Sequence, residues 1–133
     1  MKTFIFIILA VGLWACTGQE MDMKQAKKTA ETAINLIGNQ KFGELATYYS
    51  EDFSSSEPKE DRIKKFTSIV ETTGSSNSFE LLDSIVENNI GEDSRITLKY
   101  KVNHANITTF ETYKIGYESG KYVIAGIDIQ VGV

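Results

Sequence analysis

The thiol of Cys16 is the one sulfur nucleophile in this chain of 133 residues, because no second cysteine occurs. An intrachain disulfide is therefore excluded, and so is a zinc site built from several thiolates. Cys16 ends an apolar run that begins at Phe4, just after the positive residue Lys2. A charged start, an apolar middle and a small residue at the cut, here Ala15, are typical of a secretory signal peptide. We therefore expect an exported protein.

The tetrapeptide Leu13-Trp14-Ala15-Cys16 resembles the lipobox of bacterial lipoprotein signal peptides. In that family a leucine stands three places before the cysteine and a small residue stands just before it, whereas Trp14 replaces the shorter residues usual between them. The resemblance implies a cut between Ala15 and Cys16 and a diacylglycerol on the Cys16 thiol, with a third acyl chain in some members. Each buried methylene contributes roughly 0.8 kcal/mol, so two or more chains suffice for anchoring.

Three other interpretations of the apolar run compete with this one. A transmembrane helix needs about 20 apolar residues, and Thr17, Gln19 and Glu20 end the run too early for that. A plain secreted protein would keep Cys16 as an incidental thiol, and a core helix of a cytosolic protein would not explain the charged start. We favour the lipoprotein and expect residues 1–15 as signal peptide.

Residues 16–22 would then be a lipidated tether, and residues 23–133 would form one α+β domain. The expected location is the cell envelope. Thr17 is not the aspartate that marks inner-membrane retention in some bacteria, so we expect the outer membrane if the source has two.

The net charge of the exported part limits the kinds of partner that it can bind. Removing residues 1–15 leaves 118 residues with 13 basic and 18 acidic side chains, a net charge near −5 that is spread along the chain. A nucleic-acid partner needs a basic patch, so none is expected. The expected partners are the membrane, through lipid on Cys16, and an envelope protein, a peptide or a small ligand.

Residues 21–73 show the three-and-four spacing of amphipathic helices. A first helix is expected to stop at Gly38, and a short second helix follows from Phe42. The polar stretch 54–58 predicts the start of a third helix, with a serine as cap and Pro58 in its first turn. The predicted buried positions of these helices are Met23, Ala26, Ala30, Ala33, Ile34, Ile37, Phe42, Leu45, Ala46, Tyr49, Ile63, Phe66, Ile69 and Val70.

Residues 78–131 predict four sequential antiparallel strands in a meander. The strands are expected at 79–87, around 95–102, at 107–117 and at 122–131, with turns at 88–91, 103–106 and 118–121. Alternation places Ile96, Leu98, Tyr100 and Val102 on one face of the second strand. In the last strand, one face is predicted to hold Val123, Ala125, Ile127, Ile129 and Val131.

Helices grouped before an antiparallel sheet predict an α+β fold, with the N-terminal helices packed on one face of a curved four-stranded sheet. Two segments, 39–45 and 118–124, resemble the nuclear transport factor 2-like superfamily, a cone-shaped fold that includes small bacterial lipoproteins of uncharacterised function. Tyr122 stands where that family usually has tryptophan. The resemblance implies the cone fold and is a poor guide to function.

Enzymes of this superfamily use an Asp, His or Tyr inside the cone as acid or base, so these residues are the candidates for chemistry. His104, the only histidine, lies in a predicted connection, and we favour an exposed loop histidine. Asp83 and Asp128 lie within predicted strands, and for Asp128 we favour a solvated sheet surface. We assign no catalytic residue, and we expect no cofactor and no bound metal.

The aromatic residues permit two interpretations, a ligand pocket or simply the core, of which the core is the commoner. They are Tyr48, Tyr49, Phe53, Phe66, Tyr100, Phe110, Tyr113, Tyr117 and Tyr122. Two functions therefore remain. We favour a non-catalytic, lipid-anchored binding domain, and the alternative is a cone-pocket enzyme or small-molecule carrier. A deep cavity holding a buried carboxylate or convergent polar groups would favour the alternative, and a cone filled by its own side chains would remove it.

Overall fold

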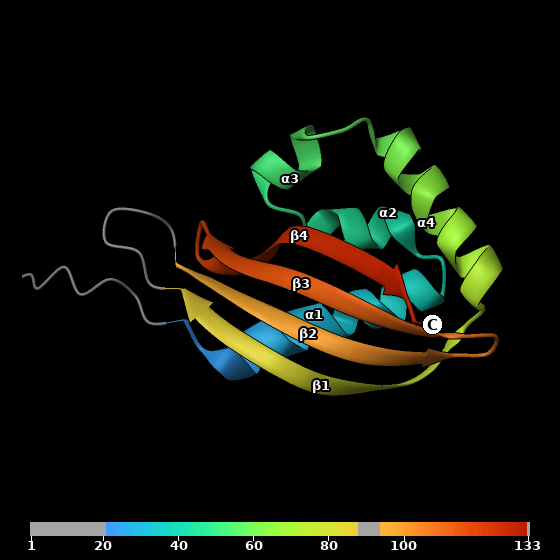
Figure 1. Cartoon of the computed structure of the whole chain (residues 1–133). Helices are drawn as coiled ribbons and strands as arrows, with labels where there is room; N and C mark the ends of the chain where they lie inside the picture. The colour runs from blue at the N-terminus through green and yellow to red at the C-terminus, as the bar shows by residue number, and fades with distance from the viewer. Residues whose placement is uncertain (1–20, 88–93, 133) are drawn as a thin grey trace, which may run out of the picture.

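The computed structural model describes residues 21–87 and 94–132, so Cys16, the lipobox and the predicted turn at 88–91 lie outside the described residues. Helices precede strands along the chain, as the sequence predicts (Figure 1). The elements are α1 (Met23–Gly38), α2 (Phe42–Leu45), the 3-10 turn η1 (Ala46–Tyr48), α3 (Glu51–Ser55), α4 (Lys59–Thr73), β1 (Ser76–Glu87), β2 (Arg95–His104), β3 (Thr108–Glu118) and β4 (Lys121–Val131).

The four strands form one antiparallel sheet in the order β1-β2-β3-β4, which confirms the predicted meander. The β3–β4 hairpin turns at Ser119 and Gly120, whose φ angles are 50° and 81°. Two successive positive φ values are the signature of the type I′ turn, whose twist matches that of the flanking strands. This turn sets the register of the hairpin, in which Glu118 pairs with Lys121.

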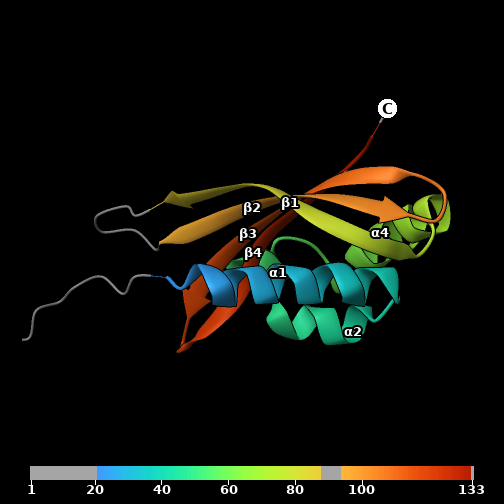
Figure 2. The same cartoon turned by 90° about the horizontal axis from the view of Figure 1, so that it is seen from below.

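Helix α1 lies across one face of the curved sheet and leaves the other face open (Figures 1 and 2). Ala26, Ala30 and Ala33 are buried at the contact, and their small side chains let the helix approach the strands closely. All four predicted inward residues of β2 are buried in the same core. Helix α4 joins through Phe66, whose ring stacks on that of Phe42 in α2 at 5.9 Å between centroids.

The start of the third predicted helix is wrong in two respects. A short helix, α3, occupies Glu51–Ser55, where we expected the polar break to begin. Its cap is Ser50, whose Oγ accepts a hydrogen bond from the Phe53 amide at 3.1 Å. Helix α4 begins after Pro58 without a side-chain cap. The serines therefore extend and end α3 instead of capping the long helix.

The predicted face of β4 is confirmed for Ile127 and Ile129 but is wrong for Val123 and Ala125, because a bulge interrupts the alternation. Lys114 pairs with Gly126 and Ile115 with Ile124, so one extra residue, Ala125, is inserted in β4. The bulge puts Ile124 in the core cluster, against which the partly buried Ile127 and Ile129 pack, while Val123 is buried outside that cluster. Within residues 21–87 and 94–132, no helix is both long and apolar enough to cross a membrane.

Candidate functional site

A buried carboxylate, Glu111, lies at the centre of the inner face of β3. Its side chain is 2% exposed, and Thr109 and Tyr113 flank it on the same face, two residues to either side. The Thr109 hydroxyl donates to Glu111 Oε2 at 2.6 Å, and the Tyr113 hydroxyl donates to Oε1 at 2.5 Å. Both carboxylate oxygens therefore accept short hydrogen bonds from the chain itself. Buried carboxylates are rare unless paired in this way.

His104 contacts the same carboxylate, and our expectation of an exposed loop histidine is wrong. Its side chain is only 6% exposed, and Nε2 lies 3.2 Å from Glu111 Oε2 and 2.8 Å from Thr109 Oγ1. The reason is that β2 continues through His104, so the residue keeps the inward direction of Val102, two positions earlier. The connection that we expected to contain it covers only residues 105–107.

The two nitrogens of the His104 ring have different partners. Nδ1 faces the backbone carbonyl of Gly74 at 3.2 Å, and a carbonyl can only accept. Nε2 faces the Glu111 carboxylate and the Thr109 hydroxyl. The arrangement is therefore a buried histidine–carboxylate pair, an ion pair when the imidazole is protonated, with hydroxyl partners from Thr109 and Tyr113.

The tyrosines beside this cluster remain protonated at neutral pH. Burial raises the pKa of Tyr113 well above its ordinary value, and the neighbouring Glu111 raises it further. Burial also raises the pKa of Tyr100, whose hydroxyl donates to Glu31 on α1 at 3.4 Å, and the nearby Glu31 charge acts in the same direction. Both rings belong to the core and meet edge to face at 6.2 Å. Neither ring lines any of the three hollows described below.

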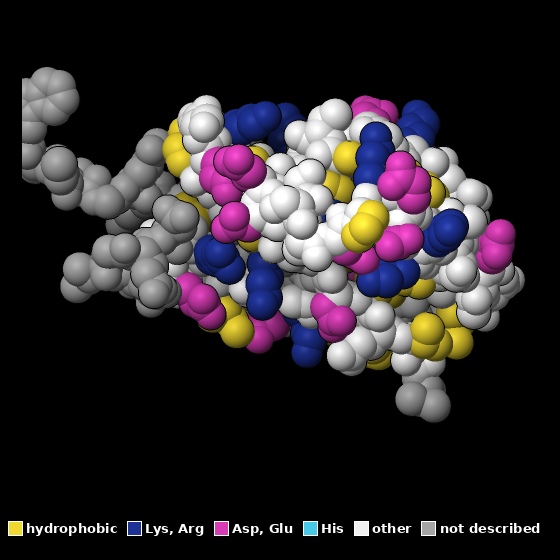
Figure 3. Space-filling view, turned by 90° about the horizontal axis from the view of Figure 1, so that it is seen from above, with side chains coloured by type: hydrophobic (Ala, Val, Ile, Leu, Met, Phe, Trp, Pro, Cys, Tyr) yellow, Lys and Arg dark blue, Asp and Glu magenta, His cyan; other side chains and the backbone are white. Residues whose placement is uncertain are grey.

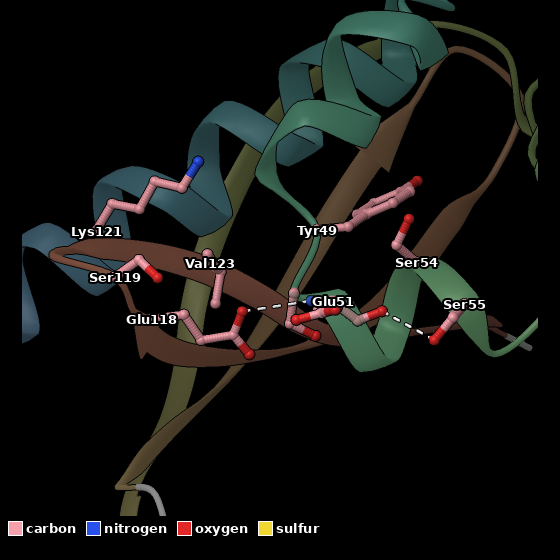
Figure 4. A pocket seen from close by; sticks show the side chains of 9 residues that line it. Tyr49, Glu51, Ser54, Ser55, Glu118, Ser119, Lys121 and Val123 are labelled. Atoms are coloured by element: carbon pink, nitrogen blue, oxygen red, sulfur yellow. Dashed lines mark hydrogen bonds between the residues drawn. The ribbon is translucent and has the colours of Figure 1, made fainter.

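One hollow lies between α3 and the β3–β4 hairpin, and we name it the hairpin groove (Figure 4). Its volume is about 420 Å³. Serine hydroxyls and Glu51 face it from α3, while Glu118 and Lys121 face it from the hairpin. Glu118 Oε2 accepts from the Glu51 amide at 3.3 Å, which ties the two walls together. The groove is lined by Tyr49, Ser50, Glu51, Ser54, Ser55, Glu118, Ser119, Lys121 and Val123.

A smaller hollow of about 50 Å³ adjoins the groove, and we name it the Arg62 pocket. Tyr49 and Ser54 line both hollows, so they form the shared wall. The pocket is lined by Phe42, Ala46, Tyr49, Ser54, Lys59, Arg62 and Ile63. Burial raises the pKa of Tyr49 to about 12, partly offset by the positive charge of Arg62. The Tyr49 hydroxyl is therefore a neutral hydrogen-bonding group at physiological pH.

Sequence reasoning missed Arg62, although a signal exists. Arg62, Phe66, Val70 and Thr73 are the buried residues of α4, so a charged residue occupies the apolar stripe of the helix. Its guanidinium lies 3.9 Å from the centroid of the Phe53 ring and 5.0 Å from that of Tyr49. A buried cation between aromatic rings requires specific partners, and α3 and its following loop supply them.

The other candidates lie away from these hollows. Asp128 is exposed, which confirms the solvated surface that we favoured, and Asp83 is exposed on β1. Phe110, at 37% exposure, is neither core nor pocket. Across the described ranges, no group of three or more His, Cys, Asp or Glu side chains could hold a metal ion. Cys16 and Ala15 lie outside the described residues, so the lipid attachment stays a prediction.

The described surface around α3 and α4 is mixed in charge. Acidic and basic side chains are interspersed on the face seen in Figure 3, and the hydrophobic side chains on it form small separate patches. The third hollow is on the outer side of α1 and is bordered by Lys24, Lys27, Lys28 and Glu31. Neither Glu111 nor His104 lines any of the three hollows. The buried ion pair and these openings are thus separate features.

Comparison with known proteins identifies the fold of this chain but assigns it to no family. No protein-family model matches the sequence, and no curated protein matches it. Solved structures match the fold of this chain, which is the α+β cone fold of the nuclear transport factor 2-like type.

One such structure is from Novosphingobium aromaticivorans and is named a "putative scytalone dehydratase". It is similar with a TM-score of 0.55 over 84% of each chain, at 8% sequence identity. At this identity the likeness shows the shared fold alone.

Proposed function

We propose that this chain is a lipid-anchored, non-catalytic domain of the cell envelope that binds a ligand in the hairpin groove. One observation carries the non-catalytic part: both oxygens of Glu111 are bound by Thr109, Tyr113 and His104 inside the cone. A general base must reach the proton that it removes. Glu111 lines none of the three hollows described above, which supports a structural role.

The hairpin groove supplies a binding surface of the required kind. Its floor contains the half-buried ring of Tyr49 and the buried Val123, and its rim presents Glu51, Glu118 and Lys121. Ligand sites combine apolar walls with a few placed polar groups, which orient the ligand. Charges of both signs and several serine hydroxyls suit a polar small molecule or a peptide segment.

The position of α1 supports a membrane-tethered arrangement. Asp22 caps α1 by accepting from the Lys24 amide at 2.9 Å, and its own amide donates to the Tyr122 hydroxyl at 2.7 Å. Asp22 is thereby held against the sheet. It lies six positions after Cys16 in the sequence, and six residues span at most about 20 Å. The domain would be held close to the lipid surface.

Replacement of the acceptor thiol tests the anchor. The Cys16→Ser variant should lose incorporation of labelled palmitate and leave the membrane fraction. The Thr17→Ser variant, which keeps the thiol and its lipobox, should behave as the wild type. Continued membrane fractionation of Cys16→Ser in a stably folded form would overturn the lipid anchor.

A site-specific photo-crosslinker tests the groove. Placed at Ser119 in intact cells, it should capture a defined species, and the reversed charge in Lys121→Glu should reduce that yield several-fold. A crosslinker at Lys99, on the exposed side of β2, is the matched control. Equal yields from both positions, or a yield that Lys121→Glu leaves unchanged, would refute binding in the groove.

A second candidate, a cone-pocket enzyme or carrier, is favoured by the His104–Glu111 ion pair inside the cone. The variant His104→Gln distinguishes a structural pair from a catalytic one, because each role predicts a different effect on stability and on ligand binding or turnover. The structural role predicts lower stability with unchanged ligand capture at Ser119 in the fraction that remains folded. Loss of ligand turnover without loss of stability would favour the enzyme.

A further inference from the structure

The guanidinium of Arg62 is buried but only partly used by the chain. Nε donates to Glu57 Oε1 at 3.0 Å, and Nη2 donates to the Phe53 carbonyl at 2.7 Å and to Ser56 Oγ at 2.8 Å. Guanidinium carries five N–H donors, so the pair on Nη1 remains. In the described part of the chain, Nη1 donates no hydrogen bond.

Nη1 is accessible even though Arg62 is only 5% exposed. The described residues contain no fully buried side-chain nitrogen or oxygen that lacks a hydrogen-bond partner. An unpartnered Nη1 must therefore meet open space, and Arg62 lines the Arg62 pocket. Arginine binds carboxylates through charge-assisted hydrogen bonds, and the two diverging N–H groups of Nη1 can each donate one such bond to a carboxylate oxygen.

The charges near the pocket leave a positive excess. Glu57 is shared, because it binds both Arg62 at 3.0 Å and Lys65 at 2.6 Å. Hydrogen bonding to Lys65, followed by that to Arg62, lowers the pKa of Glu57. It is therefore ionised at neutral pH and balances only one of the two cations. Lys59, which also lines the pocket, adds a further positive charge.

The acidic residues of the first turn of α4, Glu60 and Asp61, are exposed and do not line the pocket.

The walls and size of the pocket select what can enter. Phe42, Ala46 and Ile63 are apolar, so a bound anion would be partly shielded from water and its attraction to Arg62 strengthened. A volume of about 50 Å³ exceeds the roughly 10–15 Å³ that one water needs. It admits a carboxylate with a short apolar stem, and the shared wall of Tyr49 and Ser54 leads the remainder toward the hairpin groove.

We propose that the Arg62 pocket binds the carboxylate of a small organic acid or of a peptide C-terminus, with Arg62 and Lys59 as its cationic partners. The inference rests on the proposed function in one respect, namely that the rest of such a ligand lies in the adjoining hairpin groove. Carboxylate recognition itself needs only the pocket. Free acid and peptide end share the same chemistry, and the experiment separates them.

Propionate is the probe, and amide resonances of the exported protein in detergent are the readout. Propionate should shift the resonances of Tyr49, Ser54 and Arg62 in a saturable manner, and neutral propionamide should not. A short peptide with a free C-terminus should bind more tightly than propionate if the source is a peptide, and its amidated form should not bind. Propionate binding at least as tight as the peptide assigns the site to free acids.

Four variants give the test its specificity. Ala46→Leu fills the pocket and should weaken propionate binding at least tenfold, while Lys59→Gln should weaken it about threefold. Lys24→Gln, on the outer side of α1, is the matched control and should change nothing. Arg62→Lys should also weaken binding, and the two other pocket variants keep the test valid if that protein does not fold.

The inference fails if propionamide shifts the same resonances as strongly as propionate, or if Ala46→Leu binds propionate as tightly as the wild type. Its failure is distinguishable from that of the proposed function. Capture at Ser119 without propionate binding would overturn the carboxylate pocket alone. Propionate binding without capture at Ser119 would overturn the hairpin groove alone.

Discussion

Replacing Glu111 by glutamine should destabilise the protein by about 2–4 kcal/mol while leaving its shape intact. Three polar groups, from Thr109, Tyr113 and His104, converge on the carboxylate at 2.5–3.2 Å. Glutamine keeps one acceptor oxygen and presents an amide donor to the remaining partners. A hydrogen bond to a charged group contributes about 1.5–3 kcal/mol, and breaking a buried ion pair costs about 3–5 kcal/mol. The range given allows for partial rearrangement of the amide.

Urea unfolding of the wild type and of Glu111→Gln measures this difference. Asp128→Asn is the matched control, since the same change at an exposed carboxylate should alter the free energy of unfolding by less than about 0.5 kcal/mol. A double-mutant cycle with His104→Gln isolates the ion pair, and the two effects should be less than additive by at least about 1 kcal/mol. A cost below about 1 kcal/mol for Glu111→Gln, or strict additivity, would refute the proposed structural role.

Three further predictions concern the core, alkaline pH and the hairpin. Leu98→Ala in the centre of β2 should cost about 2–5 kcal/mol in urea unfolding, because the side chain is fully buried; a cost under about 1 kcal/mol would show a loosely packed cone. The pKa values of Tyr49 and Tyr113 are raised on folding, so their contribution is complete below the unfolded tyrosine pKa near 10 and is lost as pH rises above it. Urea midpoints should therefore fall between pH 9 and pH 11 as tyrosinate absorbance appears, and an unchanged midpoint would contradict the burial of these rings. Gly120→Ala should cost about 1 kcal/mol, because φ is 81° there. No atom lies within 4 Å of an added Cβ, so the loss of stability measured by thermal unfolding should come from backbone strain alone. A variant as stable as the wild type would refute this strain.

The layers of this fold follow from periodicity, whereas its irregularities do not. The three-and-four spacing located α1, and strict alternation located the inner face of β2, because both elements bury one continuous face. Helix α3 has only five residues and no buried residue, so it carries no stripe to detect. The bulge at Ala125 changes which residues of β4 face inward without changing their hydrophobicity.

The buried polar groups could have been found by extending the same patterns. His104 continues the alternation of β2 beyond Val102, and Glu111 lies midway between Thr109 and Tyr113 on one face of β3. Each residue is polar and was therefore assigned to solvent or to no face. Mutual pairing made their burial possible, and such pairing between strands depends on register, which single residues do not reveal.

The proposed lipid anchor at Cys16 would decide where this domain acts, and intact mass spectrometry of the protein extracted from membranes tests it most directly. The predicted mass is that of residues 16–133 carrying a diacylglycerol, with or without one further acyl chain. A mass of residues 16–133 without lipid, or of the uncut chain 1–133, would contradict a lipoprotein.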